Sequence, residues 1–399
     1  MRISNDTLRS AFLAALDAAQ RRVLDTQEKV STGKRVNSPS DDPVAAAQVA
    51  HLDASLSRLD QYQSNTTFAR NQLGLEEETL KNVIDNLQRI RELTLQANNS
   101  TASDGDRRTI AAEIRQYRDE LLTLANTTDV DGRHLFGGYN EAATPFTATA
   151  SGNVVYNGDQ GQRTLQISDS RFVAINDSGA DVFQRIPEGN GTFVLGVNTG
   201  NTGTGTLGAS SVVDPSSWVA DTYTVTFLTP TTYEVRDSAS VLVSSGTFTE
   251  PGQSIAFRGV QFALDGTPAA GDTFTVSPSA YSDVFTMLDD LVTTLETPAS
   301  DGVRRAQLHG SVGQRIANLD SALTRMIDVR GEIGARVRAL DQQDSMNADF
   351  AVHLNTTLSA VRDLDYADAI SRLSQELFGL DAAQQAFARA QNLSLFKYI

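Results

Sequence analysis

The sequence predicts an α+β protein of several domains, in which long helices from both ends of the chain pair into a coiled-coil or helical rod and an all-β domain is inserted between them. Three observations predict this fold class. Apolar residues recur at spacings of three and four from Leu8 to Leu124 and again after Tyr281, as on one face of a helix. The stretch between these parts alternates apolar with polar residues in short runs. A length of 399 residues allows two to three domains of ordinary size.

The N-terminal helices are predicted from their apolar stripes and capping residues. The stripe of the first helix consists of Leu8, Phe12, Leu16, Val23 and Val30. Ser40 is placed to cap a second helix whose first turn holds Asp41 and Asp42, where acidic side chains stabilise the positive end of the helix dipole. The second stripe continues to Ala97, which predicts a helix of roughly 55 residues, about 80 Å long. Ser103 is placed to cap a third helix.

The middle of the chain, residues 142–280, predicts a compact β domain. It is rich in Thr, Gly, Ser and Val, and it contains no lysine. Three runs alternate most clearly: Thr222–Phe227, Tyr233–Val235 and Thr273–Val276. Turn residues separate such runs, as in an antiparallel sheet. Trp218, the single tryptophan, is expected in the core of this domain.

The C-terminal part returns to helical periodicity. From Val312 to Val361 the apolar residues occupy heptad positions with a few polar interruptions, which is typical of a coiled coil. Gly331 and Gly334 lower helix propensity there, so we expect another backbone to approach closely. The stripe of the last helix consists of Ile370, Leu373, Leu377, Leu380 and Phe387. We expect antiparallel pairing of N- and C-terminal helices, with the stripes of the first and last helices as an assembly interface.

Composition and spacing argue against several classes of function. The 33 basic and 49 acidic residues give a formal charge of -16, which predicts no nucleic-acid partner. The absence of cysteine excludes disulfides, thiolate metal sites and thiol nucleophiles. The four histidines lack metal-binding spacing, and the GTGTLG run at residues 203–208 lies in a Thr/Gly tract with no helix pattern after it. We therefore predict no catalytic, cofactor-binding or metal residue and no enzyme.

The sequence also predicts no cleaved secretory signal and no membrane span. The first residues lack the basic and apolar pattern of a cleaved secretory signal. No run of about 18 apolar residues occurs, which predicts no membrane insertion.

Segments at both ends resemble a known family. Residues 31–43, STGKRVNSPSDDP, resemble a segment shared by bacterial flagellins and flagellar hook-associated proteins. Residues 332–340, EIGARVRAL, and 363–370, DLDYADAI, resemble the matching C-terminal helices. The motif residues of the first segment are Gly33, Lys34, Arg35, Pro39, Asp41, Asp42 and Pro43.

Three further features resemble the type 3 hook-associated proteins more than the flagellins. They are MRIS at residues 1–4, GRHLFGG at residues 132–138 and SLFKYI at residues 394–399. His134 departs from the aromatic residue expected at its position.

The resemblance implies three layers and a structural role. The layers are a terminal coiled-coil assembly domain of residues 1–40 with 364–399, a helical rod domain of residues 41–141 with 281–363, and an outer β domain of residues 142–280. The implied role is a ring of like subunits that joins a hook-side junction protein to the flagellin filament. The implied location is the extracellular flagellum, reached through the flagellar type III export apparatus with a cytoplasmic chaperone.

Two alternatives remain open from the sequence. The nearest is flagellin itself, the filament subunit. The other is a surface adhesin carried by the β domain, for which exposed aromatic residues such as Tyr223 or Trp218 would be the sign. A metalloprotease insert would bring an HExxH motif, and residues 142–280 contain no histidine.

Overall fold

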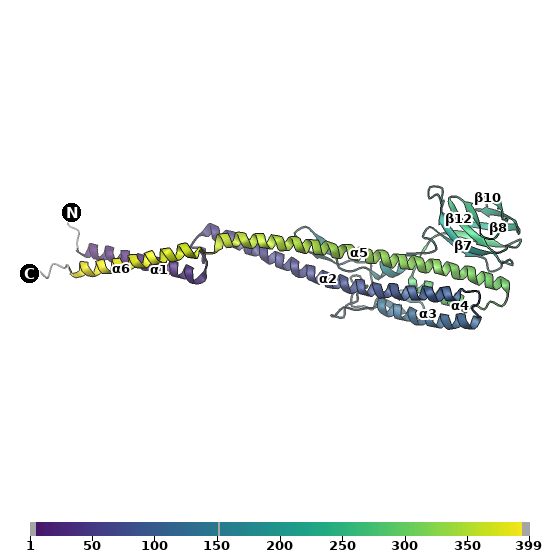
Figure 1. Cartoon of the computed structure of the whole chain (residues 1–399), viewed down its shortest axis with the longest axis horizontal. Helices are drawn as coiled ribbons and strands as arrows, with labels where there is room; N and C mark the ends of the chain where they lie inside the picture. The colour runs from purple at the N-terminus through teal and green to yellow at the C-terminus, as the bar shows by residue number, and fades with distance from the viewer. Residues whose placement is uncertain (1–4, 151, 393–399) are drawn as a thin grey trace, which may run out of the picture. The chain divides into compact units, whose positions relative to one another are not determined.

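The computed structural model describes residues 5–150 and 152–392, and long helices occupy both ends of this part of the chain (Figure 1). The predicted second helix is confirmed, since α2 spans 55 residues, and the heptad region forms a helix of 61 residues, α5. The α-helices are α1 (Asn5–Thr32), α2 (Pro43–Ala97), α3 (Asp104–Ala125), α4 (Val284–Glu296), α5 (Gly302–Arg362) and α6 (Tyr366–Asn392). The chain divides into two compact units, one made of the residues up to 65 with those from 342 onward, the other of Thr66–Asp341.

The described part of the first unit consists mainly of helices. α1 and α6 lie side by side (Figure 1). The parts of α2 and α5 in this unit pack through one apolar cluster, which consists of Leu52, Leu59, Tyr62, Leu354 and Leu358. The cluster is small because each helix contributes only one narrow stripe to it.

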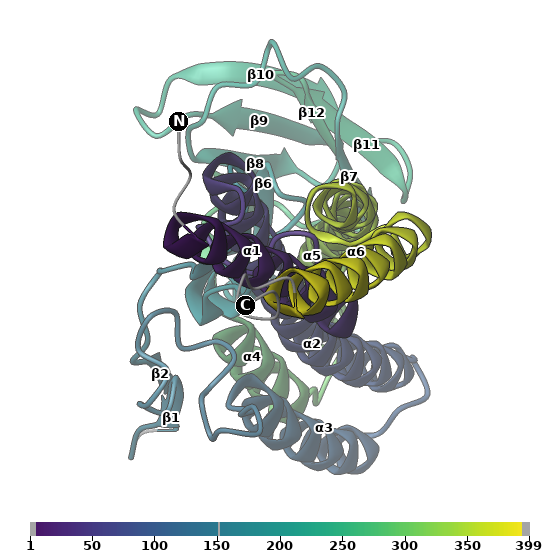
Figure 2. The ribbon, with the colours of Figure 1, turned by 90° about the vertical axis from the view of Figure 1, so that its left-hand side faces the viewer.

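The main core of the second unit lies among its helices. Leu73, Leu80 and Leu87 of α2 are fully buried and pack in one cluster with Leu121 of α3 and Leu288 of α4. α3 and α4 lie side by side (Figure 2). The apolar periodicity that predicted the helices thus corresponds to the faces that they bury.

Residues 188–280 form an antiparallel β structure with a core of its own, which we call the β module. Its strands are β6 (Phe193–Val197), β7 (Thr206–Val212), β8 (Tyr223–Thr229), β9 (Thr232–Arg236), β10 (Leu242–Thr247), β11 (Gln253–Phe257), β12 (Val260–Asp265) and β13 (Thr273–Pro278). They make a five-stranded sheet in the order β10-β9-β8-β13-β6 and a three-stranded sheet in the order β11-β12-β7 (Figure 2). Phe227, Phe262 and Phe274 fill a cluster between the sheets that is separate from the helical core.

Residues 142–187 pack differently from the β module. They form β1 (Phe146–Ala148), β2 (Val154–Tyr156), β3 (Thr164–Gln166), β4 (Phe172–Ala174), a π-helix η1 (Ala180–Gln184) and β5 (Ile186–Pro187), and β5 pairs with β14 (Tyr281–Ser282). Phe146, Ile167 and Phe183 belong to the helical core of the second unit. The packing thus differs from the expectation of one β domain over residues 142–280, because the buried side chains of this segment join the helical core and not the core of the β module.

Two local expectations have opposite outcomes. The Ser103 cap of α3 is confirmed as a reciprocal capping box, in which Ser103 Oγ accepts from the Asp106 N–H at 3.2 Å and Asp106 Oδ2 accepts from the Ser103 N–H at 3.0 Å. The expectation that another backbone approaches Gly331 and Gly334 closely was wrong for the described residues. A Cβ on Gly331 would meet nothing within 4 Å, and a Cβ on Gly334 would meet only the Arg338 side chain of the same helix.

Candidate functional site

The predicted assembly stripes of α1 and α6 include residues that face each other within one chain. The Phe12 and Phe387 rings lie 6.4 Å apart, and Thr26 Oγ1 donates to Glu376 Oε2 at 2.7 Å. Val23 is buried. Besides Phe12 and Phe387, the half-buried members of the stripes are Leu16, Val30, Leu373 and Leu380. The side chain of Leu8 lies outside the described residues. These stripes therefore shield one seam between the two helices.

Other apolar residues of this pair stay exposed. Of the predicted interface, Ile370 is 53% and Leu377 is 48% exposed. Leu13, Leu24 and Phe378 are exposed as well, and sequence reasoning missed them because they fall outside the regular stripe. Two paired helices cannot bury all their apolar side chains against one another, so the pair presents apolar surface to solvent.

Residues 33–42 and 361–366, which we call the terminal clasp, connect the two helix breaks of the first unit. Lys34 and Asp363 form an antiparallel β-bridge. The Arg35 N–H donates to Arg362 O at 2.7 Å, and the Leu364 N–H donates to Gly33 O at 3.0 Å. The sequence motif that resembles flagellins thus lies against the segment between α5 and α6.

The two aspartates of the motif stabilise the turn and the start of α2. Asp41 Oδ2 accepts from the N–H groups of Asn37 and Ser38 at 3.0 and 2.9 Å, and these hydrogen bonds hold the pKa of its carboxyl below the ordinary value. Asp42 Oδ1 accepts from the N–H groups of the first turn of α2, with Ala45 at 3.0 Å, which lowers the pKa of Asp42. The predicted Ser40 cap was therefore wrong.

Asp42 caps the helix for a simple positional reason. α2 begins at Pro43, and proline favours the first helical position, so the preceding residue takes the cap. Arg35 Nη1 lies 3.5 Å from Asp42 Oδ2, and Arg35 Nη2 donates to Val361 O at 2.6 Å. Pro39 is exposed in the turn between them. The motif residues therefore have structural partners that stabilise a turn and a helix start.

The GRHLFGG segment at residues 132–138 is held inside the second unit. Leu135 and Phe136 are buried, and the Phe136 ring packs edge-on against Phe183 at 5.2 Å. Gly138 has a φ of +74°, a conformation that favours glycine, and a side chain there would collide with Asp159. His134 Nδ1 lies 2.9 Å from Asn126 O, which gives this histidine a structural partner.

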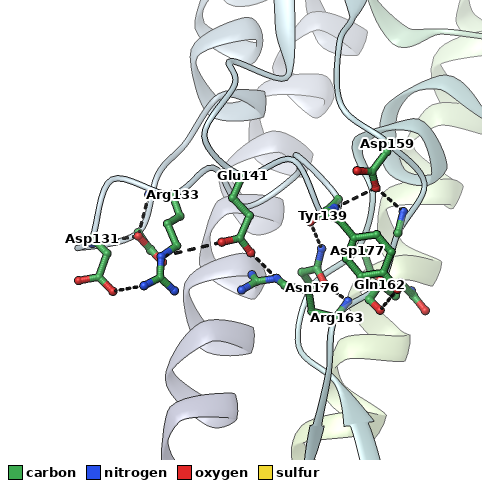
Figure 3. A network of polar contacts seen from close by, with 12 residues as sticks. Asp131, Arg133, Tyr139, Glu141, Asp159, Gln162, Arg163, Asn176 and Asp177 are labelled. Atoms are coloured by element: carbon green, nitrogen blue, oxygen red, sulfur yellow. Dashed lines mark hydrogen bonds and ion pairs between the residues drawn. The ribbon is translucent and has the colours of Figure 1, made fainter.

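A network of polar contacts fixes the loops around this segment (Figure 3). Asp159 Oδ1 accepts from the Tyr139 N–H at 2.9 Å, and Glu141 pairs with Arg163. Gln162 Nε2 donates to Asp177 Oδ1 at 2.7 Å. The network links successive loop segments over residues 131–177 to one another.

A buried carboxyl group lies where this network meets α2 and α5. Glu76 of α2 is 1% exposed, and its Oε1 accepts from the Asp177 N–H at 3.0 Å. Arg336 of α5 pairs with Asp177. Burial, and then the nearby Asp177 carboxylate, raise the pKa of Glu76 well above its ordinary value. This cluster could not be predicted from the sequence, because its members lie about 100 and 160 residues apart.

Several candidate chemistries lack support among the described residues. The described residues contain no group of three or more His, Asp or Glu side chains placed to hold a metal ion. No helix in this part of the chain combines the length and apolarity needed to cross a bilayer. The GTGTLG run enters strand β7 directly, without the helix that a dinucleotide site requires. In the β module, Tyr223 is buried, and Trp218 packs between Phe193 and Tyr223 at 5.8 and 5.7 Å.

Similarity to known proteins covers the whole chain. Residues 3–141 match the bacterial flagellin N-terminal helical region, and residues 316–399 match the bacterial flagellin C-terminal helical region. The chain is 26% identical to Flagellar hook-associated protein 3 of Salmonella typhimurium, with 100% of this chain and 99% of that protein covered.

Two crystal structures share more of the sequence. FlgL of Xanthomonas campestris is 37% identical, with a TM-score of 0.71 over 77% of this chain and 99% of that chain. Flagellar hook associated protein-3 of Legionella pneumophila is 32% identical, with a TM-score of 0.75 over 78% of this chain and 98% of that chain. The chain therefore belongs to the FlgL family of flagellar hook-associated proteins.

Proposed function

We propose that this protein is a structural component of the bacterial flagellum that joins the hook to the filament and has no catalytic activity. The observation that carries the proposal is the match along the full chain to a hook-associated protein 3, with solved relatives at 37 and 32% identity. The exposed apolar residues on α1 and α6 support self-assembly, because such side chains are stabilised when a neighbouring subunit covers them.

The proposed partners follow from this role. Like subunits form a ring through α1 and α6, and the ring contacts the hook-side junction protein on one side and flagellin on the other. The protein reaches the extracellular flagellum through the flagellar type III export apparatus, accompanied by a cytoplasmic chaperone.

Flagellin is the second candidate, favoured by the flagellin families that match both ends of the chain. Location separates the two candidates. Gold-labelled antibody against the β module should mark one point at the base of each filament for a junction protein, and the whole filament for a flagellin. An adhesin loses support, since Tyr223 is buried and Trp218 is partly buried against the core of the β module.

The test is deletion of the gene in the organism that carries it. We expect cells without filaments that release intact flagellin monomers into the medium, and the intact gene supplied in trans should restore attached filaments. Normal filaments in the deletion strain would overturn the proposal, and so would missing filaments with no flagellin in the medium.

A further inference from the structure

The two breaks in the helices of the first unit occur beside each other. α1 ends at Thr32 and α6 begins at Tyr366, and the Lys34–Asp363 bridge joins the chain between them. Four contacts cross the clasp: the bridge's two backbone hydrogen bonds, the Arg35 side chain on Val361 O, and the close approach of Gly33 to Tyr366. The partners lie more than 320 residues apart in the sequence, so this is a tertiary contact and not a local turn.

Gly33 makes the close approach possible. Its φ is +69°, and a Cβ there would lie 2.7 Å from the Tyr366 hydroxyl oxygen. Any other residue is disfavoured by backbone conformation and by this contact together.

The seam between α1 and α6 fixes its own register only weakly. Leu16, Val23 and Val30 repeat every seven residues, so a slip of one heptad would place similar side chains opposite each other. Such a slip would displace α6 along α1 by about 10 Å, at 1.5 Å per residue. The exposed Ile370 and Leu377 would then be displaced along the helix axis relative to Leu13 and Leu24.

We propose that the terminal clasp fixes the register of α1 on α6, and so sets which apolar surface the pair presents for assembly. Its importance for assembly rests on the proposed function, but the register itself is a property of the single chain. The clasp is suited to this task because its hydrogen bonds pair particular backbone groups at the start of the seam, where a slip of even one residue breaks them.

A disulfide across the clasp tests the contact directly. Lys34 and Asp363 are a pair without mutual hydrogen bonds in an antiparallel bridge, and such pairs have Cα atoms about 4.5 Å apart, within the range of a disulfide. The natural chain has no cysteine, so Lys34→Cys with Asp363→Cys introduces the only thiols. We expect rapid oxidation in the purified full chain, and at least tenfold slower oxidation of Lys34→Cys with Asp365→Cys. Equal oxidation rates of the two cysteine pairs would contradict the contact between Lys34 and Asp363.

A second cysteine pair, further along the seam, tests the register of α1 against α6. Thr26→Cys with Glu376→Cys removes the side-chain hydrogen bond seen between α1 and α6 in the described part of the seam, so the clasp and the repeating apolar side chains remain to hold the register. A short bis-maleimide should cross-link this pair in preference to Thr26→Cys with Ala383→Cys, which lies one heptad further along α6. Adding Gly33→Ala should abolish the preference. An unchanged preference would overturn the proposal.

A rescue variant separates register from general damage. Gly33→Ala with Tyr366→Phe removes the hydroxyl group that the new methyl group meets, leaving the ring carbon 3.5 Å away, and should restore part of the preference. Loss of preference with equal helix content by circular dichroism supports the clasp. The same spectrum shows whether the Gly33→Ala chain unfolds. If it does, the clasp is judged from the oxidation rates of the two cysteine pairs described above.

The outcomes also distinguish this proposal from the proposed function. Cross-linking uses purified chain and does not depend on flagellar assembly. A register preference in a protein that fails to restore filaments would leave the clasp intact and overturn the junction role.

Discussion

Arg336 and Asp177 form a two-pronged ion pair, in which the guanidinium Nη1 and Nη2 atoms donate to the two carboxylate oxygens at 2.9 and 2.8 Å. The pair ties the loop before η1 to α5. Glu76 of α2 contacts the same residue through the Asp177 backbone. Three segments that are distant in the sequence therefore meet at one point in the second unit.

Removing the cation from this cluster should destabilise the second unit. Arg336→Met leaves the carboxylate of Asp177 beside Glu76 with the Gln162 amide but without its cation, and losing one member of a buried ion pair costs about 3 kcal/mol. Urea unfolding, followed by circular dichroism, measures the change. Arg338→Met, an exposed arginine on the same helix, is the control and should change stability by less than about 0.5 kcal/mol. Equal effects of the two substitutions would contradict the structural role of the pair.

Glu76 should give the opposite result, because its neutral form suits the site. Its pKa in the folded chain is raised above the ordinary 4.5, so its stabilising contribution is full below pH 4.5 and is lost as the pH rises through the folded-state pKa. Glu76→Gln should therefore raise the free energy of unfolding at pH 7 and leave it nearly unchanged at pH 4. Each unit of pKa elevation corresponds to about 1.4 kcal/mol.

The comparison with Glu78→Gln isolates this effect. Glu78 is an exposed carboxylate two residues away on α2, 3.9 Å from Lys81. Its substitution should change the free energy of unfolding at pH 7 by less than about 0.5 kcal/mol. A Glu76→Gln chain that is less stable than the natural chain at pH 7 would show that the ionised carboxylate stabilises the site.

Leu377→Asp should prevent assembly without unfolding the chain. Leu377 is about half exposed, so a charge there costs the monomer little, while a neighbouring subunit would have to bury it. Fully burying a leucine side chain that was exposed is worth roughly 1.5–3 kcal/mol, and Leu377 can gain a part of this. We expect few attached filaments in cells and an unchanged unfolding curve for the purified protein. Gln375→Asp, at an exposed polar position of the same helix, should assemble normally, and normal assembly of Leu377→Asp would exclude this face as an interface.

The sequence predicted those parts of the fold that depend on local pattern. The length of α2 follows from a continuous stripe, and the Ser103 cap follows from a serine and an acidic residue three positions apart. The clasp could not be predicted, since nothing near Gly33 indicates that Asp363 lies opposite. The partner of a short strand is equally hidden, because alternation in Phe146–Ala148 shows which side is apolar but not which core will cover it.

Because the sequence does not show which core covers a short strand, the bounds for removing the β module have to come from the structure. The chain enters and leaves it through adjacent strands, where Ile186 and Pro187 pair with Ser282 and Tyr281 and the Glu188 N–H donates to Ala280 O at 2.9 Å. A short Gly/Ser linker in place of residues 190–278 should therefore leave the helical core intact and the protein able to join filaments to hooks. The expected measurements are an unchanged far-ultraviolet helix signal and attached filaments in the deletion strain.

A larger excision supplies the contrast. Replacing residues 145–280, nearly all of the β domain that the sequence predicts over residues 142–280, also removes Phe146, Ile167 and Phe183 from the helical core. Loss of large buried aromatic side chains costs about 3–5 kcal/mol each, comparable to the whole stability of many domains. This shorter chain should unfold or be degraded in cells, while the chain lacking residues 190–278 accumulates normally. Equal accumulation of both would mean that residues 145–187 contribute little to the core, and loss of filaments with normal levels of the smaller excision would show that the β module takes part in joining.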